Sequence, residues 1–293
     1  MIGEAGRVRV GFMFDRDRAP EELAGYAEAV ERMGADDLWV VEDLGWAGSI
    51  SATAMALAAT ENLRVGIGIA PVALRNPALL AMELATLARV HPGRVVAGVG
   101  HGVPEWMRRV GAETPRKLAL LEESIVAVRA LLAGETVNAA GEVTVDGLSL
   151  VHPPATVPPI VTGVVKPRSL ELSGRAADGT ILAEGAGPAQ VEAALAHIGR
   201  GRESGSRPSH ELIVFAYLQV TDAPTDAARE MVTAQAAWLG VAPESLFTFI
   251  GPAGTIPEKL EALRQAGADS VILRPLGPDP EHQSQAALTA LSR

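Results

Sequence analysis

The sequence predicts an α/β fold, most specifically a single (β/α)8 barrel. Short apolar runs rich in β-branched residues alternate with longer amphipathic patterns, which is typical of βα units built around a parallel sheet. Eight strand patterns are present, and the length of 293 residues suits one barrel, which needs about 250. We therefore expect residues 1–293 to form one barrel domain without an interdomain linker. A doubly wound open sheet is the alternative fold for the same alternation.

The strands and helices are predicted in alternation from one end of the chain to the other. The predicted strands are VRVGFMF (8–14), DLWVV (37–41), RVGIGIA (64–70), RVVAGVG (94–100), PPIVTGV (158–164), DGTILAE (178–184), LIVFAYLQV (212–220) and SVILRP (270–275). The predicted helices cover 20–33, 51–60, 78–90, 115–132, 169–177, 190–201, part of 224–239, 258–267 and the end of the chain.

Local signals mark where several elements begin or change. Thr255-Ile256-Pro257-Glu258 reads as a capping box that opens the late helix, with proline near its start. Residues 135–157 break the βα rhythm, and the turn glycines Gly141 and Gly147 there predict an inserted hairpin after the fourth βα unit.

Charge and cysteine content exclude several classes of function. The net charge of −10 is spread along the chain, so phosphate-rich nucleic acid is not an expected partner. The chain has no cysteine, which excludes disulfides, thiolate metal sites and thiol nucleophiles, and the histidines have no metal-ligand spacing, so we expect no metal. Neither a signal peptide nor an apolar run of membrane-spanning length is present, so we expect a cytoplasmic protein that does not bind a membrane.

In a (β/α)8 barrel the active site lies at the carboxyl ends of the strands, so the search for chemistry narrows to the residues that follow each strand. Glu42 and Asp43 follow the second strand, where they are either site carboxylates or polar loop residues. Asp15, beside Arg16 and Arg18, is interpreted as part of a loop ion pair.

The sharpest of these places is Gly98-Val99-Gly100-His101-Gly102 after the fourth strand. Glycines there allow a flat ligand to approach the backbone, and histidine can exchange protons near neutral pH. The alternative is a turn histidine bonded to a nearby carbonyl. Trp106 and Met107 come next and are candidates for a pocket wall or a loop anchor.

A basic cluster after the fifth strand predicts an anion site. Lys166 and Arg168 follow Gly163, and a helix opens close to Ser169. Free N–H groups at a helix start attract anions, and fixed positive charge adds to this. The alternative is a solvated loop.

Three segments together resemble the luciferase-like monooxygenase superfamily. They are WVVED (39–43), VGIGIAPVALRNPALLAMELATLARVHPGRVVAGVGHG (65–102) and GVVKPRSLELSGRAADGTIL (163–182), and GTIPEKLEALRQAGAD (254–269) resembles the late helix of the family. The resemblance runs over nearly the whole chain. It is closer to the deazaflavin-dependent branch, which is similar to methylenetetrahydromethanopterin reductase.

The resemblance implies a barrel that holds coenzyme F420 or FMN at the strand ends, usually as a homodimer. The family's non-prolyl cis peptide would fall on Gly68-Ile69, behind the cofactor ring, and Gly98 and Gly100 would face the cofactor. The phosphate-binding turn would fall on Gly163, Val164 and Val165, with Lys166 and Arg168 nearby. Several deazaflavin relatives carry Asp-His after the second strand, where this chain has Glu42-Asp43.

These expectations combine into three hypotheses. The first is an oxidoreductase that transfers a hydride between F420 and a small organic substrate, with His101 or Glu42 handling the substrate proton and Asp43 beside it. The second is an FMN-dependent monooxygenase of the same fold. The third is a barrel that binds flavin without turnover. The basic turn at Lys166 and Arg168 favours the first, because F420 carries an acidic tail.

Overall fold

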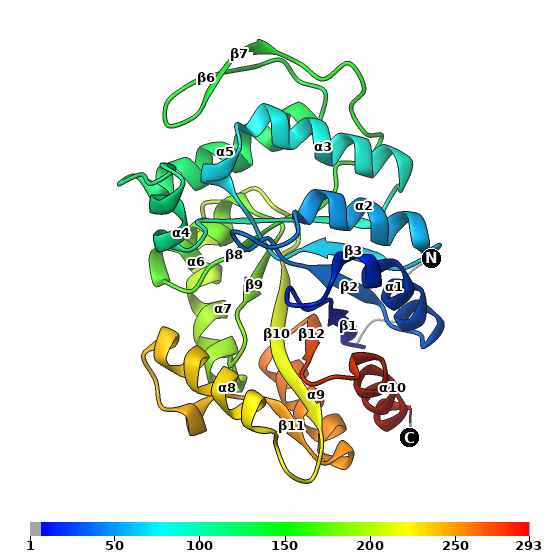
Figure 1. Cartoon of the computed structure of the whole chain (residues 1–293). Coiled ribbons are helices and arrows are strands. Elements are labelled where there is room, and N and C mark those ends of the chain that lie inside the picture. Colours follow the sequence, from blue (N-terminus) through cyan, green and yellow to red (C-terminus); the bar gives the residue numbers. More distant parts are fainter. Residues whose placement is uncertain (1–6, 293) are drawn as a thin grey trace.

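The computed structural model describes residues 7–292, in which eight parallel strands close into a barrel surrounded by helices (Figure 1). The hydrogen-bonded order is β1-β2-β3-β5-β8-β9-β10-β12, and β12 pairs back to β1 to complete the ring. This confirms the predicted (β/α)8 barrel over the open-sheet alternative. Met1 to Gly6 and Arg293, the remaining residues of the predicted domain, lie outside the described residues.

Each predicted strand is present, and the helices lie close to their predicted places, except for a short helix over 104–109 that was not predicted. The barrel strands are β1 (Arg9–Met13), β2 (Asp37–Val40), β3 (Arg64–Ile67), β5 (Val95–Gly100), β8 (Ile160–Gly163), β9 (Gly179–Leu182), β10 (Glu211–Val220) and β12 (Ser270–Pro275). The helices are α1 (Leu23–Arg32), α2 (Ser49–Ala59), α3 (Pro77–Val90), α4 (Pro104–Arg109), α5 (Lys117–Leu132), α6 (Pro167–Ala176), α7 (Pro188–Arg202), α8 (Asp226–Leu239), α9 (Ile256–Ala266) and α10 (Pro280–Leu291).

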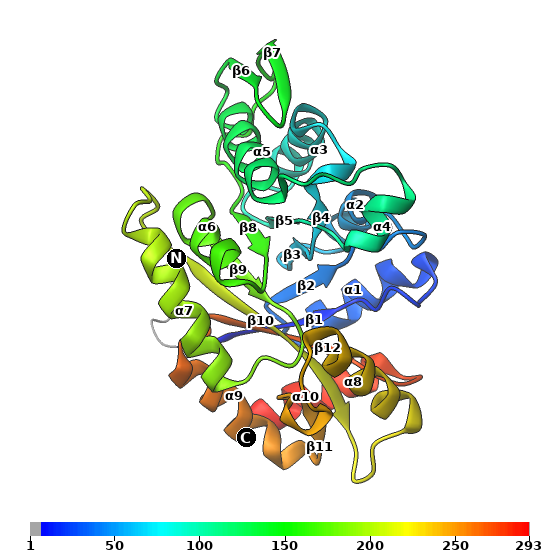
Figure 2. The ribbon, with the colours of Figure 1, turned by 90° about the vertical axis from the view of Figure 1, so that its left-hand side faces the viewer.

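A separate two-stranded antiparallel sheet lies between α5 and β8. It consists of β6 (Val137–Ala140) and β7 (Thr144–Leu148), and the register shifts between Val137 and Ala139. The two views of the ribbon place this sheet at one end of the molecule, beyond α3 and α5 and away from the barrel strands (Figure 2).

The structure differs from the sequence expectations at two element boundaries. The predicted third strand is interrupted: β3 ends at Ile67, and its continuation β4 (Ala70–Pro71) pairs with β5 instead. The predicted capping box at Thr255 is wrong, because the Thr255 hydroxyl donates to the Pro252 carbonyl, 2.9 Å away. A 3-10 turn over 253–255 already gives Thr255 helical dihedrals, whereas a capping residue needs extended ones.

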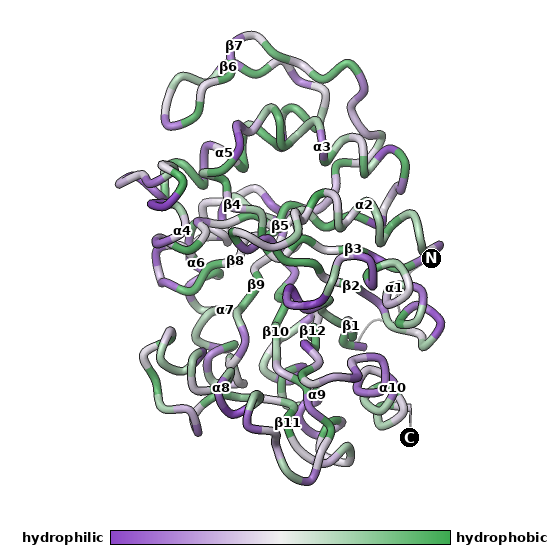
Figure 3. Tube along the Cα trace, in the orientation of Figure 1, coloured by the Kyte–Doolittle hydropathy of each residue, from purple (hydrophilic) through white to green (hydrophobic). Residues whose placement is uncertain are grey.

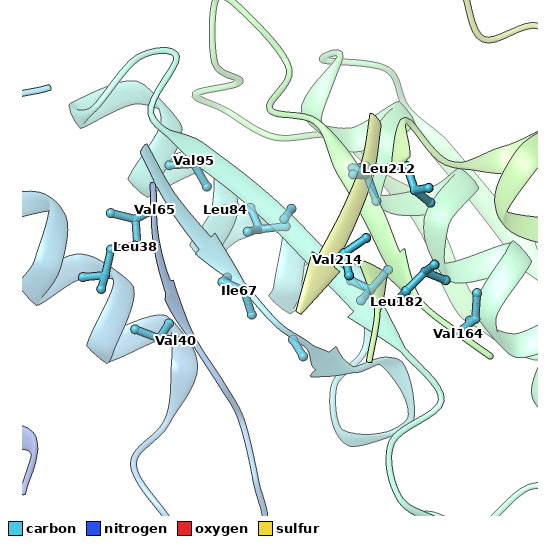
Figure 4. Close-up of a cluster of buried hydrophobic side chains, with 14 of the residues drawn as sticks. Leu38, Val40, Val65, Ile67, Leu84, Val95, Val164, Leu182, Leu212 and Val214 are labelled. Atoms are coloured by element: carbon cyan, nitrogen blue, oxygen red, sulfur yellow. The ribbon is translucent and has the colours of Figure 1, made fainter. Parts of the chain in front are cut away.

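The strands are buried on both faces, and alternate residues serve two different cores. Along β2 and β10 the outward side chains, such as Leu38 and Val214, join the large cluster between the sheet and the helices (Figure 4). The inward side chains Trp39, Phe215 and Ile272 form a second cluster inside the barrel. The hydropathy trace shows the same arrangement, with hydrophobic colour along the central strands and the most hydrophilic segments in outer loops (Figure 3).

Trp39 fills the middle of the barrel, and glycines on neighbouring strands make room for it. A β-carbon at Gly66 would lie 2.4 Å from the Trp39 ring, and one at Gly68 would lie 2.8 Å from the Phe215 ring. The two rings contact each other edge to face, with centroids 5.3 Å apart. Interiors are packed to crystal-like density, so a large side chain at one inward position requires very small ones at its neighbours.

The end of the barrel where the strands begin is closed by a charged network. Asp37 is fully buried and accepts hydrogen bonds from Arg9 and Arg64, and Arg64 also donates to both oxygens of Glu211. Burial opposes the ionisation of Asp37, but the two guanidinium groups outweigh it and lower the pKa of this carboxyl.

We predict that Gly66→Ala destabilises the protein by about 1–3 kcal/mol, because the new methyl group has no space beside Trp39. The midpoint of urea-induced unfolding measures this change. The matched control is Gly199→Ala on α7, where a β-carbon meets nothing within 4 Å, so stability should stay equal or rise slightly. Equal stability of the Gly66 variant and the wild type would contradict the tight fit around Trp39.

Candidate active site

A cavity of about 270 Å³ lies at the carboxyl ends of the barrel strands, where the barrel rule places an active site. A larger depression of about 790 Å³ lies at the opposite end, but its arginines, such as Arg64 and Arg129, are ion-paired. Nine of the predicted site residues line the first cavity: Glu42, Asp43, Gly68, Ile69, His101, Gly163, Val164, Val165 and Lys166. Gly98, Gly100 and Arg168 do not line it.

The wall of the cavity next to β3 and β5 is formed by the segment that interrupts the third strand. The peptide bond between Gly68 and Ile69 is cis, at the position that the family resemblance implies. Ile69 packs so close to β8 that a β-carbon at Gly163 would lie 2.8 Å from its side chain. The result is an apolar wall formed by Ile69 with Val164.

Gly98 and Gly100 shape the cavity from behind. A β-carbon at Gly98 would lie 1.8 Å from the Ile67 carbonyl oxygen, and one at Gly100 would lie 3.0 Å from the Gly163 carbonyl oxygen. Both positions therefore require the absence of a side chain for β3, β5 and β8 to approach one another. In this structure the two glycines contact protein backbone, and the residue after them, His101, reaches the cavity.

His101 is the polar group of the cavity with the most unusual environment. Its Nε2 atom lies 3.3 Å from the Ser169 hydroxyl, which also lines the cavity, and its buried Nδ1 atom has no hydrogen-bond partner within residues 7–292. Burial, reinforced by the positive charge of Lys117, holds the pKa of His101 below its usual value. The imidazole is therefore neutral at neutral pH and able to accept a proton.

The two adjacent carboxylates after β2 are both ion-paired. Glu42 accepts from Arg75 at 2.6 Å through one oxygen and from the Ser49 hydroxyl through the other. Asp43 pairs with Arg16 through one oxygen, and its other oxygen has no hydrogen-bond partner in the described part of the chain. Glu42 is therefore fully engaged in holding its own loop, whereas Asp43 keeps one free acceptor.

The basic turn after β8 leads into α6. Lys166 precedes the first residue of that helix, Pro167, and lies on the rim of the cavity with its side chain exposed. Ser169 is buried in the first turn of the same helix. Arg168 is exposed and does not line the cavity, so of the two predicted cations only Lys166 borders it.

A second polar group at the cavity, formed by Arg274, Asp15 and Glu184, was not predicted from the sequence. Arg274 of β12 lies 2.7 Å from Asp15 and 3.5 Å from Glu184, and Glu184 lines the cavity. The predicted ion pairing of Asp15 thus involves Arg274 instead of Arg16 and Arg18. One signal could have revealed it: Ser270, Ile272 and Arg274 alternate along one strand, so an arginine shares the inward face of a barrel strand.

Trp106 lines the cavity, and Met107 beside it is buried as an anchor of α4, so both alternatives for this pair are realised. Trp238 of α8 and Phe215 of β10 complete the aromatic part of the lining. Sequence reasoning had no means of bringing Trp238 to the site, because it comes from a helix far along the chain.

Within residues 7–292, no helix has the length and apolar character needed to cross a membrane.

We predict that His101 titrates below the value of about 6.5 for a free histidine, and that Lys117→Met moves its pKa upward by removing a neighbouring positive charge. Because the pKa is lower in the folded than in the unfolded protein, the unfolded chain binds more protons in acid. The associated stability is present above about pH 6.5 and is lost as the pH falls through the folded pKa.

Two-dimensional NMR of the imidazole gives this pKa directly, and His101→Gln identifies the resonance. The same variant should reduce the loss of unfolding free energy between neutral and acidic pH. A folded-state pKa of His101 above that of free histidine would contradict the proposed role of burial.

Comparisons with known proteins agree with this geometry. The luciferase-like monooxygenase family profile matches residues 7–272. The chain is 29% identical over 196 residues to 5,10-methylenetetrahydromethanopterin reductase of Methanolobus tindarius, a match that covers 67% of this chain and 60% of that relative. It is 29% identical over 247 residues to F420-dependent glucose-6-phosphate dehydrogenase of Nakamurella multipartita, covering 76% of this chain and 70% of the relative.

The fold is also shared with a solved structure of an F420-dependent secondary alcohol dehydrogenase in complex with an F420-acetone adduct. The two superpose with a TM-score of 0.85 at 21% identity, over 97% of this chain and 99% of the other. The family match covers most of the sequence and includes every segment that carried the predicted resemblance. The chain belongs to the luciferase-like monooxygenase family.

Proposed function

We propose that this protein is an F420-dependent oxidoreductase that transfers a hydride between the deazaflavin and a small organic substrate. The observation that carries the proposal is one cavity at the strand ends that combines an apolar wall, a neutral half-buried histidine and a rim lysine. Relatives named as F420-dependent support the choice of cofactor.

The residues present fit such a group. The wall formed by Ile69, Val164 and the backbone of Gly68 and Gly163 is apolar and has no projecting side chain at the two glycines, which suits a flat ring. Lys166, at the start of α6, would bind the anionic tail together with free backbone N–H groups of that helix, and Arg168 would meet the tail further out in solvent. The volume of about 270 Å³ lies just below the usual range for ligand pockets, roughly 300–1,000 Å³.

When bound, the deazaflavin supplies the carbon that accepts or returns the hydride. The chain's own residues position the ring, exclude water and manage the proton of the substrate. Ile69 and Val164 provide the apolar contact surface, while Trp106 and Phe215 limit the solvent on the substrate side. Exclusion of water strengthens every polar interaction that remains inside.

We assign the proton transfer to Nε2 of His101, and the Ser169 hydroxyl 3.3 Å away orients the ring. Because the imidazole is neutral, it can accept a proton from a substrate that loses a hydride, and it returns that proton in the reverse reaction. Glu42, the alternative from the sequence, is less suited because Arg75 and Ser49 occupy both of its oxygens. Asp43 retains one free oxygen and also lines the cavity, on the side that we assign to the substrate.

We predict that F420 binds the purified protein with higher affinity than FMN does, and that Lys166→Ala weakens F420 binding about tenfold, as expected for loss of a charge-assisted contact. Titrations followed by cofactor fluorescence and absorbance measure both affinities. Arg32→Ala, which removes a cation at the far end of α1, is the control and should bind F420 like the wild type.

The results of these titrations distinguish the F420-dependent oxidoreductase from the two alternative functions. Tight FMN binding without F420 binding would replace this proposal with an FMN-dependent monooxygenase, because a deazaflavin lacks the ring nitrogen used in oxygen chemistry. Binding of F420 with no turnover of any alcohol, aldehyde or imine would favour a barrel that binds flavin without catalysis.

We also propose that the protein is a homodimer. Exposed apolar side chains on the adjoining helices α2 and α3, namely Met55, Leu79 and Met82, support this, since contiguous apolar surface commonly marks an interface. Light scattering coupled to size-exclusion chromatography should give twice the chain mass of 30.5 kDa. Leu79→Glu combined with Met82→Glu should shift the protein to the monomer, and a wild-type protein of single-chain mass would refute the dimer.

A further inference from the structure

The charged groups around the cavity are divided between two sides of the barrel mouth. His101 and Lys166 follow β5 and β8, which are neighbouring strands. Glu42 and Asp43 come after β2. Glu184 comes after β9, the neighbour of β8, but its carboxylate reaches Arg274 of β12, on the side of β1 and β2. An anionic cofactor tail would therefore be met by the first side, and the second side is left for the substrate.

Glu184 is held in place beside the cavity and keeps one free acceptor oxygen. Its side chain is 13% exposed, one oxygen lies 3.5 Å from Arg274, and the other has no hydrogen-bond partner among residues 7–292. Arg274 is itself 12% exposed and is bound more closely, at 2.7 Å, by Asp15. The two carboxylates share one guanidinium, so this buried group has an excess of one negative charge.

The pKa shifts of Asp15 and Arg274 agree with two carboxylates that share one guanidinium. Burial opposes the ionisation of Asp15, but Arg274 outweighs it and keeps the pKa of Asp15 below its usual value. Burial alone would lower the pKa of Arg274, whereas Glu184 and Asp15 raise it. Arg274 therefore stays charged and binds both carboxylates, Asp15 more closely, and one oxygen of Glu184 is left free to accept from another donor.

Asp43 provides a second acceptor of the same kind on this side. Arg16 binds one of its oxygens, and the other is unpartnered within the described residues. The cavity lining also includes the aromatic side chains of Phe215, Trp106 and Trp238. A ligand that fits this part of the cavity needs an apolar body and at least one hydrogen-bond donor.

We propose that Glu184, supported by Arg274 and Asp15, is a substrate-specificity residue that selects hydroxyl- or ammonium-bearing apolar substrates and rejects carboxylates and phosphates. This inference rests on the proposed function, because it assigns the substrate side of the F420 cavity. An anion placed against Glu184 meets a like charge and leaves the acceptor unpaired, and both effects disfavour it. A donor completes the unfilled hydrogen bond.

A set of probes with one shape and three charges tests the proposal. Benzylamine is cationic at neutral pH, benzyl alcohol is neutral and benzoate is anionic. Their dissociation constants for the F420-loaded protein are measured by ligand-observed NMR, which requires no turnover. We expect benzylamine and benzyl alcohol to bind at least about tenfold more tightly than benzoate.

Three variants test whether Glu184 causes this difference in affinity. Glu184→Gln, which keeps the shape of the side chain, should reduce the benzylamine-to-benzoate affinity ratio by about tenfold. Glu192→Gln removes the same charge from the exposed face of α7 and should leave the ratio unchanged. Asp43→Asn independently removes a negative charge on the same side and should lower the ratio as well, so the test survives if one variant fails to fold.

The F420 affinity of each variant is measured first, which separates this inference from the proposed function. If the wild type does not bind F420, the proposed function fails, and the probes are then measured on the protein alone, where the effect of Glu184→Gln on the ratio still decides. An unchanged ratio in Glu184→Gln, or tighter binding of benzoate than of benzylamine to the wild type, overturns the specificity role. The specificity role is supported if the wild type shows the expected benzylamine-to-benzoate affinity ratio and only the Glu184 and Asp43 variants lower it.

Discussion

The packing of Trp39 inside the barrel is the constraint on which the other features of the molecule depend. Its ring is fully buried, contacts Phe215 edge to face and requires glycine at position 66. A barrel of eight strands encloses just enough space for side chains to fill it. Because Trp39 and its neighbours close the middle, the mouth above them becomes a cavity with an apolar base, and the charged network below them is kept apart from it.

The two ends of the barrel use the same residue types for opposite purposes. At the closed end, Asp37 and Glu211 are matched by Arg9 and Arg64, and bidentate hydrogen bonds saturate the carboxylates. At the open end, Glu184 shares a single arginine with another carboxylate and keeps a free oxygen. Saturated ion pairs contribute to a unique packing, whereas an unsaturated acceptor beside a cavity is available to a ligand. This division follows the general rule that stability lies at one end of such barrels and chemistry at the other.

The alternation of residues along the chain was sufficient to predict the barrel and the position of its mouth. Each strand and helix is encoded by a local pattern, so all eight strands could be placed without the structure. His101 could be placed at the barrel mouth for the same reason, since strand ends can be located from the pattern alone, whereas Gly98 and Gly100 before it do not line the cavity.

Pairs between distant segments could not be predicted in this way. Arg274 and Asp15 are 259 residues apart, and Trp238 comes from a helix whose path no local pattern defines. The same limit explains Thr255, whose sequence matches a capping box although the 3-10 turn before it gives the residue helical dihedrals. It also explains Gly98, whose contact with the Ile67 carbonyl depends on how two strands approach.

The pairing of the cavity carboxylates with arginines bears on His101 as well as on the substrate. An ionised carboxylate close to an imidazole raises its pKa, and a protonated histidine could not accept a substrate proton. Here Arg75 and Arg16 compensate Glu42 and Asp43, and no carboxylate contributes to the lowered pKa of His101, which is governed by burial and Lys117. The arginines thus allow acidic groups to line a cavity that also requires a neutral base.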